Sequence, residues 1–265
     1  MFRDITIGQY FPGDTIVHRL DPRTKLVLTL VYIAALFIAA GVPSYVLILC
    51  VLTCCIAASR VGVRAVFKSV KPILIVICIT AALNVFFTRG EVVAQFWVIK
   101  ITREGLINAA YMVSRLVMLI CGTFLLTYTT SPIALTDGIE SLLGPLKKIR
   151  LPVHEFAMMM SIALRFIPTL IEETDKIISA QKARGADFET GGIIRRAKAM
   201  LPILIPLFIS AFRRADELAI AMESRCYRGG EGRTRMKQLR MTGADYISLA
   251  SGAALLAAMI LLRRL

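Results

Sequence analysis

The chain has 265 residues, of which 57% are hydrophobic, and it carries 32 lysines and arginines against 18 aspartates and glutamates, a formal net charge of +14. Soluble domains are usually about 45–50% apolar, so this composition excludes an ordinary soluble protein and predicts a chain embedded in a membrane. A cationic excess in so apolar a chain is typical of cytoplasmic loops between spans, and we expect no nucleic-acid partner.

Residues 1–25 are polar and form the predicted cytoplasmic N-terminal segment. They begin Met1-Phe2-Arg3-Asp4, without an apolar run, so we expect no cleavable signal peptide. Arg19, Arg23 and Lys25 stand just ahead of the first apolar run. Cations in that position hold a chain end on the cytoplasmic side.

Two apolar runs follow, from Leu26 to Ala40 and from Tyr45 to Ala58, and Gly41-Val42-Pro43-Ser44 separates them. Each run is shorter than the roughly 20 residues that a helix needs to cross the hydrocarbon of a bilayer. We expect two spans joined by a tight external turn, and a short helical hairpin is the alternative.

A third span is predicted from Pro72 to Phe87 and a fourth from Ala109 to Tyr128, so residues 26–128 are expected to hold four transmembrane helices. The stretch between these two spans, residues 88–108, has mixed charges and is expected to be an external loop. Arg115 falls within the fourth span, where a cation at the bilayer centre costs about 2.5–3.5 kcal/mol. Two interpretations of Arg115 are open: snorkelling near the outer edge, which we favour, or an intramembrane functional role.

Residues 129–242 hold most of the charge and are predicted to form a cytoplasmic domain. A short helix opens at Pro132. A long amphipathic helix is then predicted from about Pro152 to Arg184, because apolar side chains recur along it at steps of three and four residues. Gly185 is its expected left-handed terminator.

A second long helix is predicted to begin after Gly191-Gly192 and to close at Gly229-Gly230. Pro202 and Pro206 lie inside it and should bend it. Residues 243–265 are expected to form the fifth span. The predicted fold is therefore an all-α membrane protein, with about five transmembrane helices and a cytoplasmic part of two long amphipathic helices and a shorter one.

Each long helix ends on an arginine within a short motif, Ala183-Arg184-Gly185 in the first and Ser224-Arg225-Cys226 in the second. An aspartate lies nine residues before each arginine (Asp175 and Asp216), which indicates a degenerate internal repeat. One interpretation is a cation in the last turn of an ordinary helix, where the helix dipole favours it. The other is docking of two like helices into two like partners, because a guanidinium presents five donors in a fixed fork.

The sequence shows no catalytic constellation. His18 and His154 belong to no metal-ligand motif, and neither a phosphate-binding loop nor a Gly-x-Ser-x-Gly elbow is found. We therefore expect no enzymatic activity, no cofactor and no metal site. Apart from Arg115, the predicted spans lack the ionisable groups that carriers and channels use, so the membrane part is interpreted as a scaffold.

The N-terminal residues Gly8-Gln9-Tyr10, Pro12-Gly13 and His18 to Leu26, together with the two arginine motifs, resemble a known family. It is the transmembrane coupling component, or T component, of energy-coupling-factor (ECF) type ABC importers for vitamins. The resemblance covers nearly the whole chain. It implies a location in the cell membrane, and a separate membrane-embedded S component that captures the vitamin.

The resemblance also implies that each arginine motif ends a cytoplasmic coupling helix and inserts into a groove on one of two ABC ATPase subunits, which hydrolyse the ATP. The implied docking residues are Ala183, Arg184, Gly185, Ser224, Arg225 and Cys226. The second motif departs from the family's usual form, because serine stands in place of alanine and cysteine in place of glycine. How the second helix ends is therefore open.

Three alternative functions lead to different expectations. A coupling subunit of a dedicated cobalt or nickel importer belongs to the same class, although the N-terminal run is more similar to the shared vitamin type. A self-sufficient permease or channel would conduct solute in liposomes that contain this chain alone. A membrane enzyme such as a lipid-modifying transferase would turn over substrate in isolation. Which vitamin is carried is expected to be encoded in another polypeptide.

Overall fold

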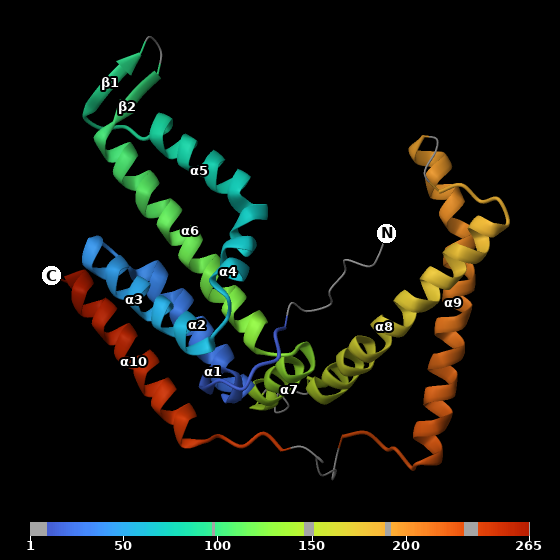
Figure 1. Cartoon of the computed structure of the whole chain (residues 1–265). Coiled ribbons are helices and arrows are strands. Elements are labelled where there is room, and N and C mark those ends of the chain that lie inside the picture. Colours follow the sequence, from blue (N-terminus) through green and yellow to red (C-terminus); the bar gives the residue numbers. More distant parts are fainter. Residues whose placement is uncertain (1–9, 97–98, 146–150, 189–191, 231–237, 265) are drawn as a thin grey trace. The chain divides into compact units, whose positions relative to one another are not determined.

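The structure, a computed structural model, describes residues 10–96, 99–145, 151–188, 192–230 and 238–264 (Figure 1). Its elements in chain order are α1 (Ile16–Arg19), α2 (Pro22–Ile38), α3 (Val42–Ser59), α4 (Val63–Val70), a 3₁₀ turn (Lys71–Ile73), α5 (Leu74–Phe87), β1 (Val92–Phe96), β2 (Ile99–Thr102), α6 (Arg103–Thr129), α7 (Pro132–Leu142), α8 (Val153–Ala183), α9 (Ile193–Ser224) and α10 (Gly243–Arg264). The chain divides into two compact units.

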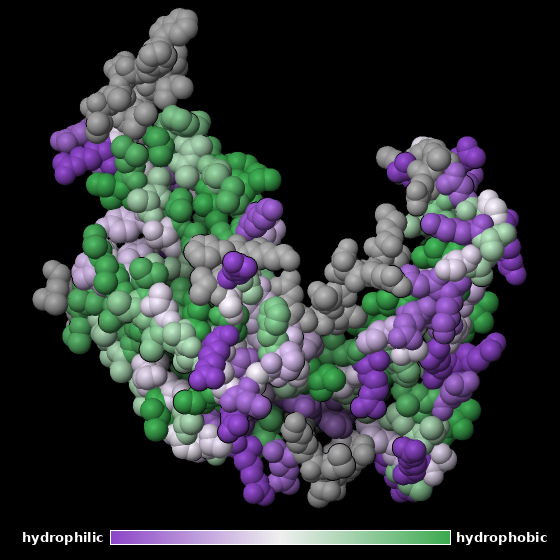
Figure 2. Space-filling view, in the orientation of Figure 1, coloured by the Kyte–Doolittle hydropathy of each residue, from purple (hydrophilic) through white to green (hydrophobic). Residues whose placement is uncertain are grey.

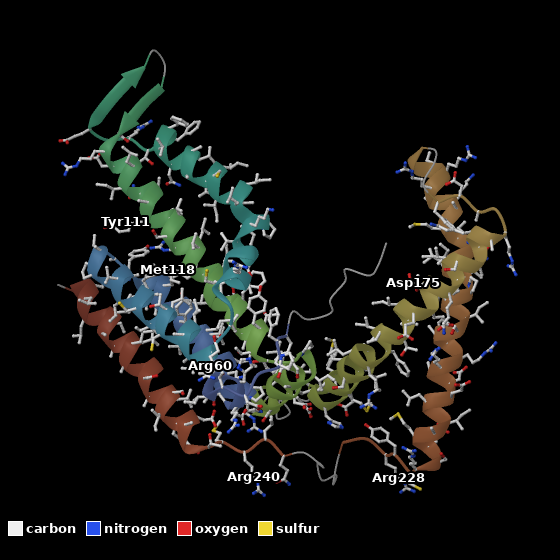
Figure 3. All side chains as sticks on the ribbon, viewed as in Figure 1. Arg60, Tyr111, Met118, Asp175, Arg228 and Arg240 are labelled. Carbon is white, nitrogen blue, oxygen red and sulfur yellow. The ribbon has the colours of Figure 1, made fainter. Side chains whose placement is uncertain are left out.

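The first unit comprises residues 8–141 and 239–265. In it α2 packs against α10 and α6, and α3, α4 and α5 also pack against α6. Leu36, Ile48 and Met259 are fully buried, and Met118 of α6 joins their cluster (Figure 3). A β-carbon on Gly252 would lie 2.6 Å from Leu28, so the absence of a side chain lets α10 approach α2 closely. The core of this unit lies where α2, α3, α6 and α10 meet.

Among the described residues, five helical segments are long and apolar enough to cross a membrane: Val42–Ser59, Arg64–Phe87, Arg103–Thr129, Val153–Ala183 and Gly243–Arg263. The predicted all-α membrane fold with about five such helices is confirmed. The five candidate spans differ from the five predicted spans at two places. The expected first span corresponds to α2, which has 17 residues and is therefore about 25 Å long, short of the roughly 30 Å hydrocarbon core. The long helix α8 is in the set because its first half is apolar.

Two details differ from the expected external loop of residues 88–108. First, β1 and β2 pair as a short antiparallel hairpin, in a stretch rich in β-branched residues. Second, α6 begins at Arg103, six residues before the predicted Ala109, because the Thr102 hydroxyl accepts the amide of Gly105 at 3.1 Å and caps the helix.

Arg115 lies midway along α6, level with the turn between α2 and α3. Its guanidinium donates to the carbonyl of Ala39 at 3.4 Å and stands about 6 Å from the rings of Phe37 and Tyr45. Ala39 is the residue that follows α2. The cation therefore satisfies a free carbonyl at a helix end, which gives it a packing role within the first unit.

The second unit comprises residues 1–7 and 142–238, and its described part consists mainly of α8 and α9. These helices run antiparallel, because the Tyr227 hydroxyl beyond the end of α9 bonds Sδ of Met158 near the start of α8 at 3.1 Å. Both helices continue through their internal prolines. Among the described residues of this unit only Val153, Ala157 and Ile203 are buried. The helix pair therefore has almost no core of its own.

The predicted limits of α8 and the predicted start of α9 agree with the structure, and α9 ends at its arginine motif as expected, but the prediction that Gly229-Gly230 closes the helix is wrong. The helix closes at Ser224 and not at Gly229-Gly230. The reason is that Cys226 takes a left-handed conformation with φ of 57°, which ends the helix four residues earlier than a glycine-based prediction places it. Gly230 instead lies against the ring of His154.

Candidate functional site

The first arginine motif is a complete helix-ending structure. Ala183 is the last helical residue, Arg184 is the cap, and Gly185 follows with φ of 87°. The amide of Gly185 donates to the carbonyl of Lys182, and the amide of Ala186 donates to that of Gln181, both at 3.0 Å. These two bonds make a Schellman motif, which satisfies carbonyls that the helix end leaves free.

The second arginine motif ends α9 in the same way. Arg225 is the cap, and Cys226 takes the left-handed position that Gly185 takes in the first motif. The amide of Cys226 donates to Glu223 at 2.8 Å, and that of Tyr227 donates to Met222 at 3.0 Å. The two ends therefore share one hydrogen-bond pattern, displaced by 41 positions, although one uses glycine and the other cysteine.

The two departures of the second motif have separate physical consequences. The hydroxyl of Ser224 donates to the carbonyl of Ala221 at 3.1 Å, a bond that the alanine of the first motif cannot make. A cysteine at positive φ places its β-carbon against the backbone, at a cost of about 1–2 kcal/mol relative to glycine. The end of α9 thus has one hydrogen bond that the end of α8 lacks, and its backbone is more strained.

Both motifs present their arginine to the surroundings. All six motif residues (183–185 and 224–226) are exposed. Neither guanidinium makes a hydrogen bond or ion pair with another described residue. A guanidinium with five free donors at the negative end of a helix dipole is suited to carbonyls or carboxylates of a second molecule.

The contact between the helices reveals how the repeat is arranged. Nη2 of Arg214 donates to Oε2 of Glu173 at 3.0 Å. Glu173 and Arg214 are 41 positions apart, the same separation as Arg184 and Arg225, so the contact joins two equivalent positions of the repeat. Contact between equivalent positions is the property of a two-fold arrangement. The helix pair therefore has an approximate two-fold axis near Glu173 and Arg214.

This symmetry sets the spacing of the two arginines. Each lies eleven residues beyond the Glu173–Arg214 contact, in opposite directions. At 1.5 Å per residue the two arginines are about 33 Å apart. Figure 3 shows the same relation through Asp175, toward the end of α8, and Arg228, just past the end of α9 at the other end of the pair. The sequence predicted both motifs, and the structure places them at opposite ends of one symmetric element.

The pair Glu173 and Arg214 was not singled out from the sequence. A signal for it is present in the sequence, because the two residues have opposite charge at the repeat spacing of 41 positions. Equivalent positions that touch across a two-fold axis are complementary rather than alike.

The faces of the helix pair also carry a large apolar surface. On α9 the exposed apolar residues recur at steps of three and four: Leu201, Leu204, Ile205, Phe208, Ile209 and Phe212. Figure 2 shows hydrophobic and hydrophilic residues side by side over α8 and α9. So large an exposed patch marks a contact surface for protein or lipid.

The described residues contain no group of three His, Cys, Asp or Glu side chains that could hold a metal ion. The two exposed arginines offer donors for binding. The arrangement is suited to recognition of another macromolecule.

Comparison with known proteins gives consistent matches. A family model described as CbiQ, cobalt transport protein, matches residues 13–236. A protein of Clostridium kluyveri named energy-coupling factor transporter transmembrane protein EcfT is 56% identical over 265 residues, which cover 99% of this chain and 98% of the relative. Proteins of the same name from Thermosediminibacter oceani and Bacillus subtilis are 55% and 47% identical, over 92% and 99% of this chain and 92% and 100% of their own lengths.

Proposed function

The chain belongs to the CbiQ family and, within it, to the energy-coupling factor transporter transmembrane proteins, and from this premise we propose that it is the coupling subunit of an ECF-type ABC importer. It is a multi-pass membrane protein. It passes motion from two cytoplasmic ATPase subunits to a membrane-embedded S component that binds a vitamin. ATP hydrolysis takes place in the ATPase subunits.

One observation carries this proposal: two matched helix ends, each with an exposed and unpaired arginine, at the two ends of an approximately two-fold symmetric helix pair. A two-fold element fits two copies of one partner, or two homologous partners, through the same contact made twice. Arginine is enriched among interface residues that contribute most to binding, where truncation typically costs about 2 kcal/mol or more. We therefore assign one ATPase subunit to Arg184 and one to Arg225.

The exposed apolar stripe of α9 supports the other half of the proposal. Phe208 and Phe212 are both 63% exposed, and a water-facing stripe of this size is costly to leave uncovered. We assign this surface to the S component. Motion at the two arginine ends then reaches the S component through helices about 46–48 Å long, without an intervening flexible segment.

The proposed topology follows from charge. Residues 129–242, including α8, lie on the cytoplasmic side of the cell membrane, as does the N-terminus. The second half of α8 carries Glu172, Glu173, Asp175 and Lys176, which are expensive to place in hydrocarbon. Its apolar first half rests at the membrane surface or against the S component.

The test is a double charge reversal, Arg184→Glu with Arg225→Glu, in the complex co-expressed with its ATPase subunits. Loss of about 2 kcal/mol at each site lowers ATPase affinity about 30-fold for each single variant and about 1,000-fold for both together. The matched control is Lys176→Glu with Arg213→Glu, which reverses one exposed cation on each of the same helices near the middle of the pair. We expect the control to retain the ATPase subunits and ATP-dependent uptake. Unchanged ATPase co-purification and uptake in the first double variant would refute the docking role.

The family description names cobalt, so a dedicated metal importer is the second candidate. The relatives that match over nearly the whole chain carry the energy-coupling factor name, which favours the vitamin type. Identification of every subunit and bound small molecule in the native complex separates the two. Several S components with bound vitamins support our proposal, and a single partner loaded with cobalt or nickel contradicts it.

A further inference from the structure

The polar N-terminal motif has a role that the docking function does not explain. Residues 142–238 are inserted into the first unit, so the chain leaves that unit after α6 and α7 and returns just before α10. Both connections meet the same short turn, Asp21 to Lys25, at the start of α2. All the contacts described below lie within the first unit.

Asp245 holds the returning connection. This carboxylate, in the first turn of α10, is fully buried. Its Oδ2 accepts both the amide and the hydroxyl of Thr242 at 2.7 Å, which fixes the start of the helix. Its Oδ1 accepts the amide of Asp21 at 2.8 Å, across 224 positions of sequence. One side chain therefore ties the return of the chain to the start of α2.

Lys25 holds the departing connection. Its ammonium group is buried and donates to the carbonyl of Thr129, the last residue of α6, at 2.8 Å, and to that of His18 at 3.1 Å. Just beyond, α7 packs on the same turn, since a β-carbon on Gly138 would lie 3.0 Å from Pro22. Burial lowers the pKa of Lys25 to about 8, and the carboxylates of Asp245 and Asp21 offset part of that lowering.

Buried charges are an expensive way to hold helices together. Apolar residues of similar size usually give equal or greater stability, whereas charged groups fix geometry through directed bonds. Here the directed bonds fix the two chain connections of one inserted unit relative to each other. That is the arrangement needed if force on the inserted unit is to reach α2 without being lost in its connections.

We propose that Asp21, Lys25 and Asp245 form a polar clasp that transmits displacement of residues 142–238 to the membrane helices, with Lys25 and Asp245 as positioning residues. The proposal rests on the proposed coupling function. It assigns the N-terminal motif to transmission, and the arginine motifs to docking.

The test uses the complete complex in liposomes, with a riboflavin-binding S component and tritiated riboflavin as the probe. Asp245→Asn and Lys25→Gln each remove part of the clasp at nearly constant volume. We expect the ATPase subunits to co-purify as with the wild type, ATP hydrolysis to stay within about twofold, and riboflavin transported per ATP to fall at least fivefold. Lys25→Arg, which keeps the positive donors, should recover most of the ratio.

The control for a merely structural role is Leu52→Val, a substitution at a buried apolar residue of α3 in the hydrophobic core of the same unit. It should lower the melting temperature and leave the transport ratio unchanged. The proposal is overturned if riboflavin transported per ATP is unchanged in the clasp variants, or if it falls equally in Leu52→Val. If Asp245→Asn and Lys25→Gln do not fold, Thr242→Val is the milder variant, because it removes only the hydroxyl that donates to Asp245. If Thr242→Val changes neither the melting temperature nor the riboflavin transported per ATP, the proposal is also overturned.

Failure of the proposed function gives a different result. If the proposed coupling function is wrong, the wild-type chain shows no ATPase binding or no ATP-dependent uptake. If only the clasp proposal is wrong, the wild type works and the clasp variants transport as much riboflavin per ATP as the wild type does.

Discussion

The two units of the molecule differ in what covers their apolar side chains. In the first unit, α2, α3, α6 and α10 bury residues such as Leu36 and Ile48 completely against one another. In the second, α9 leaves most of its large apolar residues exposed, and most of those on α8 are only half-buried. The first unit is therefore held by its own core, while the described part of the second is held mainly by local helix-forming interactions and offers its exposed apolar face to the partners that we propose.

This difference suits the two units to different roles in a transporter subunit. A unit with its own core keeps its shape under load, which suits a membrane scaffold. A helix pair without a core keeps both faces free for partners and is stiff only along its helix axes. The arginine motifs lie at the ends of those axes, where we propose that a partner docks and displaces the helix.

The largest expected effect comes from removing the same side chain in both units. Ile48 is fully buried, and Ile48→Ala should cost about 3 kcal/mol and lower the melting temperature of the purified chain by about 8 °C. Ile209 is 57% exposed, and Ile209→Ala should stay within about 0.5 kcal/mol. Thermal unfolding in detergent measures both variants. Equal losses would show that the second unit has a core after all.

A smaller effect is expected at the two helix ends, where local terms make up most of the stability of the open unit. Gly185→Ala places a β-carbon at φ of 87° in otherwise open space, so its cost of about 1 kcal/mol comes from the backbone alone. Cys226→Gly relieves the corresponding strain at φ of 57°. Hydrogen exchange at the amides of Ala186 and Tyr227 should become about fivefold faster in the first variant and slower in the second.

Cys226→Ala is the control for these two variants, because it keeps a β-carbon at the strained position and should leave the exchange rate nearly unchanged. Slower exchange in Cys226→Ala as well would mean that the thiol, and not the backbone, limits the stability of this end.

Local signals in the sequence were sufficient for much of the second unit. Gly185 and Gly192 flank the connection between α8 and α9, and both helix limits there were predicted from them. The left-handed conformation of Cys226 was not predicted, and closure was also placed at Gly229-Gly230, because cysteine does not usually mark a left-handed position. The β1–β2 hairpin was missed because a short mixed stretch has neither a clear period nor a distinctive turn.

In the candidate site, too, features with a local sequence signal were predicted and contacts between distant residues were not. Both arginines were found from spacing, since each lies in a visible motif. The Glu173–Arg214 contact and the Asp21–Asp245 bond join residues 41 and 224 positions apart. Their partners depend on how helices pack, and helical periodicity in one sequence carries no information on which helix meets which.

The central claim is that each arginine-capped helix end contacts an ATPase subunit. Its most direct test is photo-cross-linking in the native complex, with a benzophenone amino acid at Ala183 or Ser224, so that both arginines stay in place. Glu172 and Ala215, exposed on the same helices and next to the Glu173–Arg214 contact at the middle of the pair, are the controls. We predict cross-links to ATPase subunits from positions 183 and 224 and none from 172 and 215. Absence of ATPase cross-links from 183 and 224, or cross-links of equal yield from the control positions, would contradict the account.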